Sequence, residues 1–443
     1  MRSLVILFLT FCSFPIQAQV WQAVGNFPPS SASCVAVDDQ GNVYAAGGLL
    51  NSAGHQYVAK WNGLTWSELG GFDMLAANGM IRAIHVDSFG HVWAAGAFTN
   101  ASGKNYVAYF DGTSWTELGG SNALNISGAI NTLSVDNQKN VYVGGAFKNG
   151  NTCYIMKFNG TAWSALGGNT LAANDYIFAV KAVNPNTVYV GGDFSNASGF
   201  KYVAYWNGST WSELGGTNSL HANAGITEII TDNLGNVYAG GAFTNDSNWR
   251  YVAAYKSGIW SELGGNFSFP GFGGLINALM SDPAGNIYAA GGFHQSNKRF
   301  VTKYNGLGWN EVGGTQGLAA NNYIYDLAYG IDQSIYACGG FTNSLGDFYL
   351  ARFGYPSDIN NVTDTSTLTF YPNPVSEYMT IDLKTPAQNF QVNIMNIHGA
   401  QVFHATYQQA HTIQVDLHHL PKGIYLLRLT AGNQKNEQVF LKN

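Results

Sequence analysis

VYAGG at residues 237–241 is followed by YVAAY at 251–255 and by WSELGG at 260–265, and close variants of these three segments recur along the chain. The tryptophan of the third segment recurs every 48 or 49 residues, as Trp66, Trp115, Trp163, Trp211, Trp260 and Trp309. Trp21, in the segment WQAVG, precedes Trp66 by 45 residues. A repeat of about 48 residues with three or more strands in each unit is typical of a β-propeller.

Each repeat is predicted to contain four antiparallel strands. An alternating apolar segment, such as ITEIITD at 226–232, precedes each element of the VYAGG type. Tight turns separate the strands, with DNLGN at 232–236 between a first and second strand and NG at 62–63 between a third and fourth. Asp at the start and Gly-Asn at the end of the first turn fit a hairpin, because Gly adopts positive φ freely. We therefore expect each unit to be a four-stranded meander.

The two ends of the repeat region are predicted to complete one another. The segment YLARF at 349–353 is not followed by a tryptophan strand, whereas Trp21–Gly25 is a tryptophan strand without a unit of its own. Pairing the two segments removes two exposed sheet edges. The sequence thus predicts an all-β fold, with a seven-bladed β-propeller over residues 20–354 that is closed across its termini.

The order of Gly-Gly, Tyr and Trp in each repeat resembles that of kelch-type repeats, over about three quarters of the chain. It resembles more closely the repeats of secreted bacterial proteins with the pattern VYVGGxFTNASG…YVAYWNG…WSELGG. Both resemblances imply a fold rather than a chemistry. The kelch-like oxidases that use copper need Tyr, His and Cys ligands, and the sequence offers no equivalent set. We therefore expect no cofactor and no bound metal.

A second domain is predicted after a polar linker at residues 355–367. Its segments include LTFYPNPVSEYMTIDL and FQVNIMNIHGAQVF, in which apolar and polar residues alternate and Pro, Gly and Asn interrupt the pattern. This pattern predicts a small Ig-like β-sandwich over residues 368–443.

The C-terminal region resembles the type A sorting domain of the type IX secretion system of Bacteroidota. The matching segments are Tyr371–Pro374, Gly399, Leu420–Tyr425 and Val439–Lys442. Gln438 departs from the family, which often has Lys there. The resemblance implies that the secretion machinery carries the chain through the outer membrane, after which this domain is removed and the protein is released or anchored. We therefore expect a secreted or cell-surface protein.

The first 19 residues are predicted to be a signal peptide. Arg2 supplies a positive end, the apolar segment from Leu4 to Phe14 is too short to span a bilayer as a helix, and Ala18 fits a cleavage site. No other stretch is long and apolar enough for a membrane helix, so we expect no transmembrane segment in the mature chain. A net charge of −6 without a basic block argues against a nucleic-acid partner.

The recurring ionisable residues are predicted to be structural. An acid two residues after the strand tryptophan is interpreted as an edge charge that discourages sheet aggregation, at Glu68, Glu117, Glu213, Glu262 and Glu311. The hairpin acids offer too few oxygen ligands for a calcium loop and are interpreted as turn formers, at Asp87, Asp136, Asp232 and Asp282. The odd number of cysteines left in the mature chain favours free buried thiols, at Cys34, Cys153 and Cys338.

The predicted binding site lies at the mouth of the propeller channel, on the face that carries the connections from each outer strand to the next inner strand. Four of these connections read LAANG, LAAND, LHANA and LAANN, and they align Asn78, Asn174, Asn223 and Asn321, with Asp175 and Arg82 nearby. Amide side chains both donate and accept, which suits sugar hydroxyls or a peptide backbone. The alternative is that each Asn bonds to the backbone of its own turn.

The sequence contains neither a GxSxG nucleophile elbow nor an HExxH metal motif, so no catalytic residue is assigned. Whether the protein is an enzyme stays open, although the pattern favours a binding protein. The leading hypothesis is a secreted or cell-surface binding or scaffold propeller that contacts an extracellular glycan or protein. One alternative is a polysaccharide-active enzyme, a lyase or a glycoside hydrolase, for which the strand-lining charges Arg82, Glu228 and Asp326 speak. Another is a passive surface-layer or adhesion component.

Overall fold

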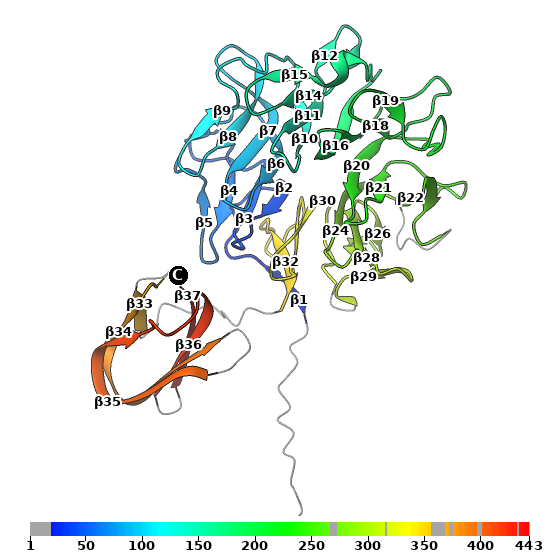
Figure 1. Ribbon diagram of the computed structural model, residues 1–443. Helices are drawn as coiled ribbons and strands as arrows, with labels where there is room; N and C mark the ends of the chain where they lie inside the picture. Colours follow the sequence, from blue (N-terminus) through cyan, green and yellow to red (C-terminus); the bar gives the residue numbers. More distant parts are fainter. Residues whose placement is uncertain are drawn as a thin grey trace, which may run out of the picture. The chain divides into compact units, whose positions relative to one another are not determined.

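The computed structural model describes residues 19–265, 273–314, 317–355, 368–371, 375–396, 401–431 and 434–442. The chain divides into two compact units, Met1–Pro356 and Ser357–Asn443 (Figure 1). Regular structure in the described residues consists of β-strands and short 3₁₀ turns, among them η1 (Leu166–Asn169), so the all-β prediction is confirmed. The predicted signal peptide and linker lie outside the described residues, except for Gln19 and Tyr355.

In the described part of the first unit, seven antiparallel sheets have four strands each. The first two sheets are β2 (Ala32–Val37), β3 (Val43–Gly47), β4 (Ala59–Trp61), β5 (Trp66–Glu68), and β6 (Ile81–Val86), β7 (Val92–Thr99), β8 (Asn105–Phe110), β9 (Trp115–Glu117). The next two are β10 (Ile130–Val135), β11 (Val141–Gly145), β14 (Met156–Phe158), β15 (Trp163–Ala165), and β16 (Ile177–Asn184), β17 (Thr187–Gly192), β18 (Ala204–Trp206), β19 (Trp211–Glu213).

The fifth and sixth sheets are β20 (Ile226–Thr231), β21 (Val237–Gly241), β22 (Ala253–Lys256), β23 (Ile259–Glu262), and β24 (Ile276–Ser281), β25 (Ile287–Gly291), β28 (Thr302–Tyr304), β29 (Trp309–Glu311). The seventh is β30 (Ile324–Tyr329), β31 (Ile335–Gly339), β32 (Ala351–Gly354) and β1 (Val20–Ala23). Two short hairpins extend the third and sixth repeats, β12 (Lys148–Asn149) with β13 (Thr152–Cys153) and β26 (His294–Gln295) with β27 (Lys298–Arg299).

A β-bulge recurs near the start of the first strand in all seven of these sheets. In β20 the ladder skips Thr227, between the paired residues Ile226 and Glu228. A Cβ on Gly241 in the second strand would collide with the carbonyl oxygen of Gly225, because the bulged backbone passes so close. The glycine that lies opposite the first residue of the first strand is therefore required by the bulge, which also re-aims the skipped side chain.

The first strands pack against one another in the order β2, β6, β10, β16, β20, β24 and β30, and β30 packs against β2 in turn. Figure 1 shows these strands gathered toward the centre of the first unit, with the later strands of the sheets outside them. The arrangement is propeller-like, because the first strands surround a common axis.

A tryptophan indole links each of these sheets to its neighbour. Trp260 Nε1 donates to the carbonyl oxygen of Leu214, in the preceding sheet, at 2.9 Å. Equivalent bonds are donated by Trp66, Trp115, Trp163, Trp211 and Trp309. Trp21 continues the series, since its Nε1 donates to Val312 O at 3.0 Å.

The N-terminal strand β1 occupies the fourth place in a sheet whose other strands come from the end of the unit. Val20 lies opposite Gly354 and Trp21 opposite Phe353, with the two aromatic ring centroids 5.4 Å apart. The carbonyl oxygen of Val24 then accepts the indole N–H of Trp66 at 2.7 Å.

The hairpin aspartates form turns, as predicted. Asp232 Oδ1 accepts the backbone N–H groups of Leu234 and Asn236, each at 2.9 Å. Asp232 Oδ2 accepts the hydroxyl of Tyr238 at 2.9 Å. The buried tyrosine of the VYAGG segment thus finds its partner in the preceding turn, which explains why Asp and Tyr recur together.

The second unit contains β33 (Leu368–Tyr371), β34 (Tyr378–Asn396), β35 (Gln401–Asp416), β36 (Gly423–Ala431) and β37 (Gln434–Lys442). The long strand β34 pairs with β35 along its length, with β33 near its start and with β36 near its end. Both halves of β34 contribute side chains to one hydrophobic core, with Met379 and Ile381 from the first half and Val392 and Ile394 from the second. Tyr371 is described, whereas residues 372–374 and Gly399 of the sorting motifs lie outside the described residues.

Candidate functional site

The four predicted asparagines each clamp two loops of one face together. Asn223 Oδ1 accepts the backbone N–H of Thr244 at 2.9 Å, and its Nδ2 donates to the Thr244 hydroxyl at 2.9 Å. Asn78, Asn174 and Asn321 make the same paired contacts with the residue 21 positions further along. We call this side of the unit the loop face, because it holds the loops after second strands and after fourth strands.

The clamps differ from both roles expected for these residues. Each asparagine bonds to a neighbouring loop rather than to its own turn, so the predicted structural alternative had the wrong partner. All four side chains are exposed, and an amide has two donor and two acceptor directions. Each Asn therefore keeps hydrogen-bonding capacity toward solvent while holding the loops.

Arg82 and Asp175, the other two predicted site residues, lie at the loop-face ends of β6 and β16. Arg82 is the residue skipped by the bulge in β6, and its exposed guanidinium donates through Nη1 to Asn131 Oδ1 of the next first strand. Asp175 Oδ1 accepts the N–H of Tyr176 at 2.8 Å. The side chain of Arg82 therefore reaches across to the neighbouring first strand β10, while the carboxylate of Asp175 is turned toward its own backbone.

Two pairs of aromatic residues at the same mouth were not expected from the sequence. β30 carries Tyr325 at its bulge with Tyr323 just before the strand, and β16 carries Phe178 with Tyr176 in the same two places. Tyr323, Tyr325 and Tyr176 are 38%, 38% and 42% exposed. Tyr323 and Tyr325 lie nearly parallel, at 9°, with ring centroids 6.5 Å apart. Comparison of the repeats could have found them, since the equivalent places in the other first strands lack aromatic residues.

Further along the first strands from the loop face lie four half-buried ionisable side chains: His85, Lys181, Glu228 and Asp326. Burial, together with the nearby charge of Asp326, raises the pKa of Glu228 from 4.5 to about 8. Burial likewise raises the pKa of Asp326 to about 7. Burial lowers the pKa of His85 to about 4 and also lowers that of Lys181. These positions along the first strands therefore hold charge at a cost, and the two carboxyl groups bind protons near neutral pH.

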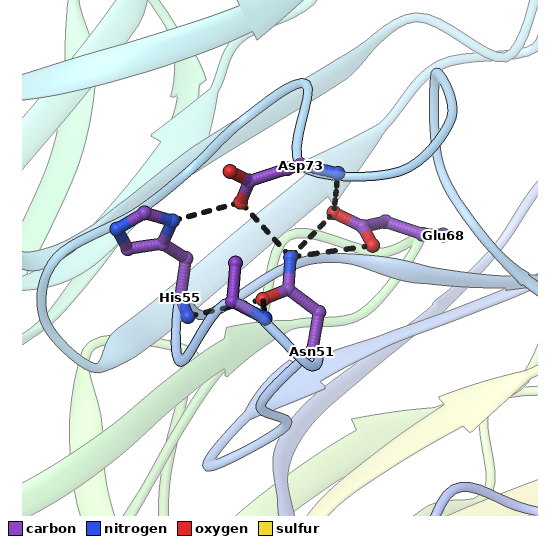
Figure 2. Close-up of polar contacts among 5 residues, drawn as sticks. Asn51, His55, Glu68 and Asp73 are labelled. Atoms are coloured by element: carbon purple, nitrogen blue, oxygen red, sulfur yellow. Dashed lines mark hydrogen bonds and ion pairs between the residues drawn. The ribbon is translucent and has the colours of Figure 1, made fainter.

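Besides lying in the outermost strands, four of the acids that follow the strand tryptophans bind loops of the loop face: Glu68, Glu117, Glu213 and Glu262. Glu117 Oε1 accepts the backbone N–H of Asn122 at 2.7 Å, and the carboxylate also accepts the amide of Asn100. The first repeat replaces Asn122 with Asp73, which Figure 2 shows beside Glu68, Asn51 and His55. Asp73 Oδ1 lies 2.8 Å from His55 Nδ1.

The described residues contain no group of three or more His, Cys, Asp or Glu side chains able to hold a metal ion. Cys34, Cys153 and Cys338 are free and buried, as predicted. Burial raises the pKa of all three thiols, which makes them poor nucleophiles. No helix in the described part of the chain is long and apolar enough to cross a membrane.

Comparison with protein families indicates how the chain is exported and where it is located. Residues 369–443 match the secretion system C-terminal sorting domain. The chain is therefore exported by type IX secretion to the cell surface or the medium, and this domain interacts with the secretion machinery. A search of curated proteins found no match to the chain.

Among solved structures, the chain is similar to the extracellular domain of a putative hybrid two-component system from B. thetaiotaomicron. The identity is 12% and the TM-score 0.51, over 96% of this chain and 57% of that one. The extracellular domain of a putative one-component system from the same organism matches at 12% identity and a TM-score of 0.48, over 95% and 52% of the two chains. The chain thus spans a little over half the length of these structures, and the first likeness concerns the fold alone.

Proposed function

We propose that the seven sheets described above are the blades of one β-propeller, closed across its termini by β1 and spanning residues 20–354. The continuous packing of first strands and the unbroken series of indole bonds from Trp21 to Trp309 support this proposal. The order of Gly-Gly, Tyr and Trp supports repeats of the kelch type. Residues 1–19 are the signal peptide, and residues 368–443 form a small Ig-like sandwich.

We propose further that the protein is a secreted or cell-surface binding propeller that contacts an extracellular glycan or protein at the loop-face mouth. The observation that carries this proposal is the pair of exposed tyrosines on β30 with a second aromatic pair on β16. Exposed aromatic rings add nothing to a closed core and are typical of contact surfaces. Arg82, Asp175 and the loop-clamping residues Asn78, Asn174, Asn223 and Asn321 surround the same mouth.

The binding function is tested by immobilising residues 20–443 and screening polysaccharides and envelope extracts for retention. We expect one or more partners for the wild type, and weaker retention for the variant Tyr176→Ala/Tyr323→Ala with the same melting temperature. Absence of any partner across the panel contradicts the function. Retention that survives the double substitution would show that the partner binds elsewhere on the protein.

The role of the asparagines has its own test, the triple variant Asn78→Ala/Asn174→Ala/Asn321→Ala. Loss of retention at an unchanged melting temperature assigns these side chains to the ligand. A lower melting temperature with intact retention assigns them to loop clamping only.

A second candidate function is a polysaccharide-active enzyme, and Glu228 with Asp326 is the observation that favours it. Both carboxyl groups lie in the channel wall with raised pKa values, and such perturbed acids are frequent in active sites. Release of reducing or unsaturated sugar ends from plant or algal polysaccharides, abolished by Glu228→Gln, would favour the enzyme. A passive surface-layer or adhesion component would instead alter cell adhesion on deletion without retaining any soluble partner.

A further inference from the structure

The tyrosines at the mouth are held in place by the repeated Gly-Gly pairs. A Cβ on Gly292 would overlap the ring of Tyr323, and a Cβ on Gly340 would lie 3.3 Å from the hydroxyl of Tyr325. The backbone of each glycine thus forms a seat for one aromatic ring. The two rings are fixed before a ligand arrives, which lowers the entropy lost on binding.

A cation accompanies each aromatic pair. The guanidinium of Arg299 lies 5.4 Å from the ring centroid of Tyr323, and the ammonium of Lys148 lies 5.2 Å from that of Tyr176. Arg299 Nη1 donates to the carbonyl oxygens of Asn297 and Asn321, whereas its buried Nε has no hydrogen-bond partner. Each aromatic surface is therefore bordered by positive charge that is not neutralised by a carboxylate partner among the contacts described.

The aromatic pairs lie on opposite sides of the mouth. Around the ring of first strands, β16 and β30 are three places apart in one direction and four in the other. The equivalent places on the strands between them hold small, aliphatic or polar residues, namely Gly225 and Thr227 on β20 and Leu275 and Asn277 on β24. A ligand that uses both pairs must therefore extend across the mouth.

Charged side chains occur on both faces of the repeat unit, and the cations nearest the aromatic pairs are on the loop face. The protein has a net charge of −6, yet cationic side chains recur on the loop face at Arg82, Lys148, Lys201, Arg250 and Arg299. Acidic side chains recur in the hairpins of the opposite face, at Asp38, Asp39, Asp87, Asp111, Asp136, Asp232, Asp282 and Asp332. The loop face also carries acids, at Asp73, Asp175, Asp193, Asp246 and Asp347, so the positive charge that concerns the aromatic pairs is that of Lys148 and Arg299 beside their rings.

We propose that the mouth binds an acidic polysaccharide, whose sugar rings lie on the tyrosines and whose carboxylate or sulfate groups contact Arg82, Lys148 and Arg299. This inference rests on the proposed binding function and adds the class of ligand. Glu228 and Asp326, deeper in the channel, oppose an anion less than ordinary acids would, because their raised pKa values leave them partly protonated near neutral pH.

The test measures retention of residues 20–443 on polygalacturonate, on a sulfated galactan and on neutral dextran. We expect retention on the two acidic polymers, weakened by salt because exposed charges are screened. Lys148→Gln/Arg299→Gln is expected to weaken binding about tenfold or more, because a charged hydrogen bond contributes about 1.5–3 kcal/mol and 1.4 kcal/mol is a factor of ten. Lys157→Gln is the matched control, since Lys157 lies over the ring of Tyr142, away from the mouth.

The possible failures separate this inference from the function on which it rests. Equal, tyrosine-dependent retention on dextran overturns the acidic class and leaves a glycan-binding propeller. Retention on the acidic polymers that Lys148→Gln/Arg299→Gln leaves unchanged overturns the assigned contacts. If no polysaccharide is retained while an envelope protein is, the ligand class is wrong and the binding function stands. If nothing is retained, both are wrong.

Discussion

At the scale of single residues, one glycine in each repeat links the fold to the candidate site. The glycine opposite the first residue of each first strand, such as Gly241 or Gly339, admits the bulge of that strand, and the bulge turns one side chain out of the ladder. Arg82, Phe178 and Tyr325 occupy this bulged place in three of the first strands. The repeat thus keeps the backbone constant while the exposed residue changes from one strand to the next.

Removing the charge of Glu228 is expected to stabilise the protein above neutral pH. Its folded pKa lies above its unfolded value, so its contribution to stability is greatest below pH 4.5 and is lost as the pH rises through about 8. The wild-type melting temperature should therefore fall between pH 6.5 and 9, and Glu228→Gln should reduce that fall. Thermal unfolding across this range is the measurement.

The neighbouring groups define the controls for that experiment. His85, whose pKa is lowered, acts in the opposite sense at lower pH, and the lowered pKa of Lys181 opposes the fall at higher pH. The difference between wild type and Glu228→Gln cancels the contribution of His85, whereas Lys181 and Asp326 interact with Glu228, so the difference reports Glu228 together with its effect on these two groups. An identical pH dependence in the two proteins would contradict the burial of this carboxyl group.

The indole bonds between sheets predict a second effect at this scale. Trp260→Phe keeps an aromatic ring and leaves the carbonyl oxygen of Leu214 without its donor, so we expect a loss of about 1–2 kcal/mol in the free energy of unfolding. Denaturant unfolding measures this loss, with Trp206→Phe in the third strand as the comparison.

Truncation of a fully buried tryptophan to alanine is expected to lower the free energy of unfolding by about 3–5 kcal/mol. Trp211 is only half-buried, so Trp211→Ala should cost less than that range.

At the scale of elements, β1 is the strand on which the seventh sheet depends. Deleting Trp21–Gly25 removes the partner of β32, the donor to Val312 O and the acceptor of the Trp66 indole. We expect a lower melting temperature and more aggregation, because β32 becomes an exposed edge. Removal of residues 1–19 alone is the control. A melting temperature unaffected by the longer deletion would refute closure by β1.

The strand pattern could be predicted from the sequence because turns and apolar alternation are local signals. The loop contacts could not be predicted from the sequence. Asn223 and Thr244 lie in different loops, and only the folded structure brings these loops together. The contact of Glu117 with Asn100 could not be predicted for the same reason, because Asn100 lies in another loop. Tyr323 and Tyr325 were not predicted as site residues because they depart from the repeat pattern. A comparison of the repeats emphasises the residues that all repeats share.

At the scale of the whole molecule, the sorting domain and the repeat unit are separate compact units. Removing residues 368–443 should leave the repeat unit folded in the periplasm and absent from the surface and the medium. Cell fractionation with circular dichroism of the retained protein checks both parts of this prediction. Fusion of residues 368–443 to an unrelated periplasmic protein should export that protein. Normal display of the truncated chain on the cell surface would contradict the assignment of residues 368–443 as the sorting domain.

The antiparallel pairing of β1 with β32 also has a mechanical consequence. Val20 and Gly354 form the end pair of this ladder, so the chain enters and leaves the repeat unit at the same end of one strand pair. Tension applied through both chain ends pulls the two strands apart one residue pair at a time, like a zipper, instead of shearing all the pairs together. The sheet that joins the two ends is therefore the weakest under load, and a pulled repeat unit opens there first.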